Sequence, residues 1–112
     1  MAEVLGALEQ AVLLAVVRLR DEAYGRAVLK EVQTRLERDV APGAVHATLE
    51  RLETRGLLRS RLGSGTPIRA GRARRYYRLQ PAGLKALNAA RETFDTLWQG
   101  LKWPLVKAGS IT

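Results

Sequence analysis

Residues 43–62 read GAVHATLERLETRGLLRSRL. This segment is the most informative about the fold, and the elements before and after it are predicted by starting from it. The first part has helical spacing, because Val45, Leu49 and Leu52 recur every three or four residues. Gly56 stands where a residue in the left-handed conformation commonly ends a helix. After that glycine, apolar or small residues alternate with arginines, which is the period of a strand. The segment therefore predicts a helix that is followed at once by a β-strand.

A β-hairpin is expected after this helix. The strand predicted over residues 58–62 is followed by a second alternating segment over residues 74–79. Between them, residues 63–72 are rich in glycine and arginine and contain a proline, as in a long connecting loop. We therefore predict a basic hairpin, or wing, over residues 57–79.

Helical spacing also runs through residues 4–19 and residues 24–38. The first of these segments is apolar on every side in its middle, which is typical of a helix buried from several directions. Pro81 begins a last helix, whose mostly apolar seam alternates spacings of three and four residues, as in the heptads of a coiled coil. The residues of this seam are Leu84, Leu87, Arg91, Phe94, Trp98 and Leu101.

This order of elements predicts a mainly α fold with a small β-hairpin, namely a winged helix-turn-helix with one C-terminal dimerisation helix. We assign residues 1–80 to the DNA-binding domain, residues 81–103 to the dimerisation helix and residues 104–112 to a flexible tail. The C-terminal seam needs a partner, because a domain closed by its first helix cannot also cover the seam. A homodimer with two-fold symmetry follows from this requirement.

Positive charge is unevenly distributed along the 112 residues, which carry a formal net charge of +8. Residues 1–40 hold six basic and seven acidic side chains, residues 41–80 hold nine and two, and residues 81–112 hold four and two. Seven arginines and no acidic residue lie within residues 59–78. Because the planar guanidinium suits phosphate groups and guanine edges, this segment makes nucleic acid the first partner to consider.

The predicted DNA interface consists of the 43–55 helix and the wing. The N-terminal half of the helix would enter the major groove, where small residues let the backbone approach the DNA closely. His46 and Arg51 could reach base edges or phosphates, although His46 is equally well explained as an ordinary surface residue. The wing arginines would lie along the phosphate backbone. The predicted DNA-binding residues are Gly43, Ala44, His46, Ala47, Arg51, Arg61, Arg69, Arg72 and Arg74.

Composition argues against other classes of function. The absence of cysteine excludes disulfides and thiolate metal sites, and His46 is the single histidine. The longest apolar run, residues 11–17, is seven residues long, against roughly 20 for a membrane span. The sequence also lacks a phosphate-binding glycine motif followed by lysine. We therefore expect no enzyme, cofactor, metal site or membrane partner, and a cytoplasmic protein without a secretory signal.

The sequence resembles the PadR family of transcriptional regulators over residues 4–87. Residues 43–57 resemble the recognition-helix signature of that family, and the segment RRYYRL that precedes a Pro-Ala-Gly is similar to its second wing strand. The first residues of the first two predicted helices also match the family's pattern. The remaining matching segments are residues 5–9 (LGALE) and residues 24–25 (YG).

This resemblance implies a bacterial, nucleoid-associated transcription factor that usually acts as a repressor and a homodimer. The single C-terminal helix is similar to the short-tailed branch of the family. The resemblance also implies an interface built from the first and last helices, and a small aromatic effector beside Trp98 and Trp103. The family often carries tyrosine where this chain has His46, so no tyrosine contact is transferred. The predicted dimer residues are Leu5, Leu8, Val12, Leu84, Leu87, Arg91, Phe94, Trp98 and Leu101.

Two alternatives remain open at the level of sequence. A basic module for RNA or nonspecific DNA would show a similar charge distribution. A protein-interaction dimer with an incidental basic face is the third class. The coiled-coil seam and the uneven charge favour a dimeric, sequence-specific DNA-binding regulator over both.

Overall fold

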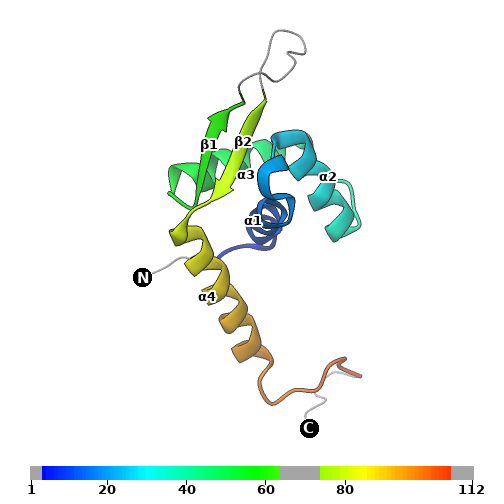
Figure 1. The fold of residues 1–112 in the computed structure, drawn as a ribbon. Helices are drawn as coiled ribbons and strands as arrows, with labels where there is room; N and C mark the ends of the chain where they lie inside the picture. Colours follow the sequence, from blue (N-terminus) through cyan, green and yellow to red (C-terminus); the bar gives the residue numbers. More distant parts are fainter. Residues whose placement is uncertain (1–3, 64–73, 107–112) are drawn as a thin grey trace.

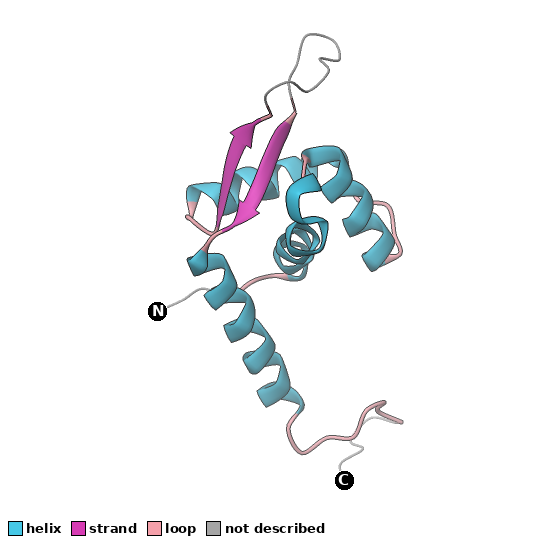
Figure 2. Cartoon of the chain, viewed as in Figure 1, coloured by secondary structure: helices cyan, strands magenta, loops and turns pink. Residues whose placement is uncertain are grey.

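The computed structural model describes residues 4–63 and 74–106. Two antiparallel strands stand beside a group of helices, and a last helix projects away from it (Figures 1 and 2). This arrangement confirms the predicted mainly α fold with a small hairpin. The elements in order are α1 (Ala7–Leu19), the 3₁₀-helix η1 (Arg20–Glu22), α2 (Gly25–Leu36), α3 (Pro42–Thr54), β1 (Leu58–Leu62), β2 (Arg75–Leu79) and α4 (Pro81–Trp98).

α1 lies in the middle of the domain and begins at Ala7, three residues later than predicted (Figure 1). Its start is set by Glu9, whose carboxylate accepts a hydrogen bond of 2.9 Å from the backbone N–H of Gly6. Leu5 and Val12 are 3% and 0% exposed, so both belong to the domain's own core. The prediction that they form the dimer interface is therefore wrong, because neither side chain reaches the surface.

α2 and α3 form the helix-turn-helix pair. α2 ends at Leu36 because the next residue, Glu37, takes a left-handed backbone conformation with φ of 52°. The side-chain amide of Gln33 donates a hydrogen bond of 3.1 Å to the carbonyl oxygen of Val40, which secures the turn between the helices. α3 has Pro42 as its first residue, where a missing N–H costs nothing. Gly56 follows α3 with φ of 80°, as predicted.

The hairpin pairs β1 with β2 so that Arg59 lies opposite Arg78 and Ser60 lies opposite Tyr77. Its inner face packs on α3, and Tyr77 is buried there. The backbone N–H of Tyr77 also donates a hydrogen bond of 2.8 Å to the carbonyl oxygen of Ala23. The base of the wing is therefore joined to the segment that leads into α2.

α4 packs on the domain only near its beginning and then extends away from it (Figure 1). Gly83 lies against the hairpin, where a Cβ atom would stand 2.6 Å from Cδ1 of Leu79 and closer still to the carbonyl oxygen of Leu57. The helix ends at Trp98, which corrects the predicted seam, because Leu101 lies beyond the helix. Within the described ranges, no helix is both long and apolar enough to cross a membrane.

Candidate nucleic-acid interface

The N-terminal half of α3 presents small residues to the exterior. Gly43, Ala44 and Ala47 are exposed, whereas Val45 and Leu49 on the other side of the helix are buried in the core. A helix surface of this kind lets a DNA groove approach the backbone closely, since no long side chain intervenes. The structure therefore brings the small residues selected from the sequence onto one exposed surface.

His46 stands on the same part of α3. Its Nε2 lies 3.7 Å from a carboxylate oxygen of Glu50, and both side chains are about two-thirds exposed. His46 and Arg26 line a shallow hollow of about 280 Å³ between α2 and α3. Arg26 lies in the first turn of α2 and was not among the residues predicted from the sequence. Arg26 and His46 give this surface two polar side chains beside the small residues.

Arg51 is less available for a contact with DNA than its position in the sequence suggests, because its side chain has partners within the domain. Its Nε lies 3.8 Å from Oε2 of Glu9 on α1, and its guanidinium donates a hydrogen bond of 3.4 Å to the hydroxyl of Thr48. The same Glu9 oxygen accepts a hydrogen bond of 3.2 Å from Arg55. Glu9 thus joins α1 to the C-terminal half of α3 and gives Arg51 a partner within the domain.

Near the loop end of its two strands, the wing holds two of the predicted DNA-binding arginines against tyrosine rings. The guanidinium of Arg61 lies 5.1 Å from the ring centre of Tyr76, and that of Arg74 lies 4.1 Å from the ring centre of Tyr24. The two rings meet edge to face, with centres 5.7 Å apart. Both arginines are exposed, so they remain able to contact phosphate. The other predicted wing residues, Arg69 and Arg72, lie outside the described residues.

A chain of polar contacts fixes the inner face of the wing to α3. The Ser60 hydroxyl donates a hydrogen bond of 2.7 Å to Glu53, and Arg75 donates one of 2.9 Å to that hydroxyl. Burial raises the pKa of the Tyr77 phenol above its ordinary value, and the Glu53 carboxylate adds to the increase. These contacts keep α3 and the hairpin in a fixed relative position.

Most of the chain matches a known family of regulators. Residues 13–89 match the family model described as "Transcriptional regulator PadR-like family". The "Transcriptional regulator Rv3488" of Mycobacterium tuberculosis (strain ATCC 25618 / H37Rv) is 39% identical over 77 residues, which are 69% of this chain and 67% of that protein. The chain belongs to the PadR-like family of transcriptional regulators. The resemblance found in the sequence is thereby confirmed.

Solved structures of PadR-like proteins have the same fold. A PadR family transcription regulator from Clostridium difficile R20291 has a TM-score of 0.66 and 22% identity, covering 82% of this chain and 91% of its own. A PadR family regulator from Eggerthella lenta DSM 2243 has a TM-score of 0.62 and 29% identity, covering 80% of this chain and 75% of its own. Together with the family match, these likenesses confirm the winged-helix architecture.

The PadR-like chain also carries an exposed apolar groove of about 600 Å³ between α1 and α4. Leu84, Leu87, Arg91 and Phe94 were selected from the sequence and line it. Leu8 is only partly exposed and packs on the core instead. The groove residues that the sequence analysis missed are Gln10, Leu14, Val17, Asn88 and Asp95.

The two tryptophans of this PadR-like chain are not brought together. Trp98 is half-buried at the end of α4, where its ring centre lies 6.4 Å from that of Phe94. Trp103 lies beyond the helix and is 80% exposed. Neither tryptophan is among the described residues that line the groove. A single chain therefore offers no shared pocket of these two rings.

Proposed function

We propose that this protein is a sequence-specific, double-stranded DNA-binding repressor that acts as a homodimer on a pseudo-palindromic operator. In this proposal residues 43–55 read bases in the major groove and the wing, residues 57–79, holds the phosphate backbone. Residues 1–80 bind DNA, whereas residues 81–103 join the two protomers. Two recognition helices related by two-fold symmetry would enter the DNA about one turn, ~34 Å, apart.

The exposed N-terminal half of α3 is the observation that carries the proposal. Gly43, Ala44 and Ala47 offer a helix surface without long side chains, next to a hairpin whose Arg61 and Arg74 are exposed. Phosphate contacts supply affinity but little sequence information, whereas a helix in the groove can distinguish base pairs. The combination favours a sequence-reading protein over a purely electrostatic one.

The groove between α1 and α4 supports the homodimer. Leu14 and Val17 of α1 are 39% and 45% exposed, and Leu84 and Phe94 of α4 are 54% and 59% exposed. Apolar patches of this kind on small proteins commonly mark interaction sites, because water makes their exposure unfavourable. The same groove on a second copy is the most direct cover, since a two-fold interface uses one patch on both partners.

Binding to DNA tests the proposal directly. The promoter of the protein's own gene and a random duplex of equal length are compared at one fixed salt concentration. A sequence-specific regulator should bind the promoter about 10³-fold more tightly or better. Equal affinity for both duplexes would contradict the proposal and favour a nonspecific nucleic-acid-binding module, and no binding to either would favour a protein-interaction dimer.

Repression is tested separately with a reporter gene placed behind that promoter. Expression of the intact chain should lower reporter output, because a dimer seated on the promoter obstructs transcription. A chain with Ala44→Glu and Ala47→Glu is the comparison, since both positions are exposed and each new carboxylate repels phosphate. Equal reporter output from the two chains would contradict the proposed role as a repressor.

A small aromatic effector beside Trp98 also belongs to this proposal. Phe94 and Trp98 offer two neighbouring rings near the projecting end of α4, with ring centres 6.4 Å apart. An aromatic molecule bound there would stack on them and alter the geometry of the dimer. Titration of the dimer with aromatic carboxylic acids, followed by tryptophan fluorescence, tests this. Unchanged fluorescence of Trp98 in a Trp103→Phe chain would count against an effector at this position.

A further inference from the structure

Glu9 of α1 lies beside the C-terminal half of α3 and contacts two arginines there. Its Oε2 lies 3.8 Å from Nε of Arg51 and accepts the hydrogen bond of 3.2 Å from Arg55. Its Oε1 accepts the hydrogen bond of 2.9 Å from the backbone N–H of Gly6. The Glu9 side chain is only 18% exposed. The carboxylate is therefore held by contacts to two helices and is largely shielded from solvent.

The exposed face of α3 that begins with Ala44 and Ala47 continues into these two arginines. Arg51 and Arg55 follow at steps of four residues, which keeps them on that side of the helix. Their side chains are 53% and 28% exposed. A helix that enters a major groove by its N-terminal half leaves its C-terminal turn toward the rim of the groove, where the phosphates lie. Both guanidinium groups are therefore on the side of α3 that would approach the DNA backbone.

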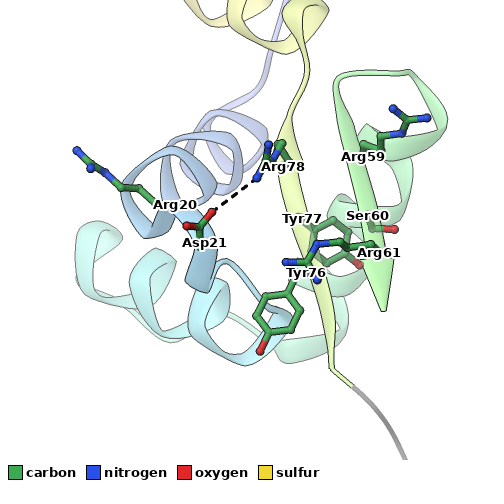
Figure 3. Close-up of a pocket in the computed structure, with 8 residues that line it drawn as sticks. All are labelled: Arg20, Asp21, Arg59, Ser60, Arg61, Tyr76, Tyr77 and Arg78. Carbon is green, nitrogen blue, oxygen red and sulfur yellow. Dashed lines mark ion pairs between the residues drawn. The ribbon is translucent and has the colours of Figure 1, made fainter. Parts of the chain in front are cut away.

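The contact of Glu9 with α3 differs from the ion pair on the outer face of the hairpin (Figure 3). There, Arg78 lies 3.6 Å from Asp21, and both side chains are more than three-quarters exposed. A pair of that kind contributes little stability, because water and salt screen it. Glu9 is screened less, and it serves two guanidinium groups with one oxygen. Arg51 and Arg55 are therefore given up to a phosphate less readily than Arg78.

We propose that Glu9 is a positioning residue that holds Arg51 and Arg55 away from the DNA backbone and so limits sequence-independent binding. Phosphate contacts add affinity without sequence information, so a carboxylate that occupies two arginines and repels phosphate reduces that share of the affinity. The inference rests on the proposed function, since it requires α3 to approach DNA. It extends that function by giving α1, which does not enter the groove, control over the charge that α3 presents.

The test is Glu9→Gln in the full chain, with a random duplex as the probe and fluorescence anisotropy at several salt concentrations as the readout. Glutamine also suits this position of a capping box, so the contact with Gly6 can remain while the charge is lost. Affinity for the duplex at 0.1 M salt should rise about fivefold or more. The slope of log K against log salt should steepen by about 0.9 for each phosphate that is newly contacted.

Glu31→Gln is the matched control. Glu31 is 22% exposed and pairs with Arg35 at 2.8 Å on α2, so its replacement removes the same charge and releases an arginine outside α3. This chain should bind the random duplex within about twofold of the unchanged chain, because exposed charges beyond a Debye length of about 10 Å from the phosphates are largely screened. An equal change of slope in the Glu9→Gln and Glu31→Gln chains would overturn the proposal.

A double-mutant comparison shows whether the effect passes through the two arginines. In a chain with Arg51→Gln and Arg55→Gln, adding Glu9→Gln should leave the slope unchanged, because no arginine remains to be released. A steeper slope in that chain would overturn the proposal. So would weaker binding of the Glu9→Gln chain at an unchanged slope, which is the result expected if Glu9 only joins α1 to α3.

Thermal unfolding shows whether the Glu9→Gln chain is folded. If it is not, the chain with only Arg51→Gln and Arg55→Gln supplies the test, and its slope should differ from that of the unchanged chain by less than about 0.9, since Glu9 already occupies both arginines. A larger loss would overturn the proposal. Failure of the proposed function appears separately, as equal affinity of the unchanged chain for promoter and random duplex.

Discussion

Gly83 shows how one residue sets the position of a whole helix. Its missing side chain lets α4 rest on Leu57 and Leu79, and a Cβ atom would stand 2.6 Å from the Leu79 side chain. Gly83→Ala should therefore lower the free energy of unfolding by about 1–3 kcal/mol, as for other overpacked sites. Urea unfolding measures this, with Gly43→Ala as the control, because nothing lies within 4 Å of a Cβ there. Equal stability of the Gly83→Ala chain and the unchanged chain would show that α4 can shift at no cost.

Tyr77 makes stability depend on pH at the alkaline end. Burial raises the pKa of its phenol, and Glu53 raises it further, so the folded pKa exceeds the unfolded value. Its contribution to stability is complete below the unfolded pKa of about 10 and is lost as pH rises through the folded pKa. The free energy of unfolding should fall less steeply above about pH 10 in a Tyr77→Phe chain. Parallel alkaline profiles for the two chains would contradict this assignment.

At the scale of elements, the wing is expected to act through phosphate contacts. Arg61→Ser with Arg74→Ser should reduce affinity for all duplexes and lower the slope of log K against log salt by about 0.9 for each phosphate that is no longer neutralised. Fluorescence anisotropy at several salt concentrations measures the slope. Arg35→Ser with Arg18→Ser removes equal charge, and Arg35 already pairs with Glu31 on α2 at 2.8 Å. An unchanged slope in the wing variant would mean that these arginines do not touch the DNA backbone.

The type and order of the elements were predictable, whereas their ends were not. Residues 58–62 were predicted as a strand and form one, because alternation is a local signal. α1 instead begins at Ala7, because the cap at Gly6 sets its start. α4 stops at Trp98, because the chain turns through Gly100. Such ends depend on particular hydrogen bonds and backbone conformations, which apolar spacing does not report.

At the scale of the whole molecule, the projecting α4 leaves large apolar side chains of a single chain exposed to solvent. Phe94→Asp should convert the dimer into monomers, because the 59% exposed ring is placed in the proposed interface and a buried unpaired carboxylate is costly. Sedimentation equilibrium measures the association, and folding of the single chain should be unaffected. Thr93→Asp is the matched control, since Thr93 is exposed on α4 and does not line the groove.

The two outcomes of that experiment are distinct. Loss of the dimer together with weaker operator binding fits a regulator that holds two half-sites at once. A Phe94→Asp chain that still sediments as a dimer would show that the α1–α4 groove is not the interface. The Thr93→Asp chain should keep both its association and its affinity for DNA.

The amino-acid sequence alone specified the order of the elements and the place of the positive charge. Both are local properties, since the spacing of Val45, Leu49 and Leu52 and the count of arginines need no knowledge of neighbours in space. The candidate DNA-contacting positions could be selected in the same way, but the ion pair of Arg51 with Glu9 could not. That contact joins residues 42 positions apart in the chain, so no local pattern contains it.

Packing, in contrast, specified which apolar residues remain at the surface. α1 is apolar on nearly every side, so its sequence offers no clear polar face to mark the exterior. Only the arrangement of α2, α3, the hairpin and α4 around it buries Leu5 and Val12 and leaves Leu14 and Val17 exposed. The sequence therefore selects α1 and α4 for the proposed interface, whereas the fold shows which of their apolar residues are exposed and able to form it.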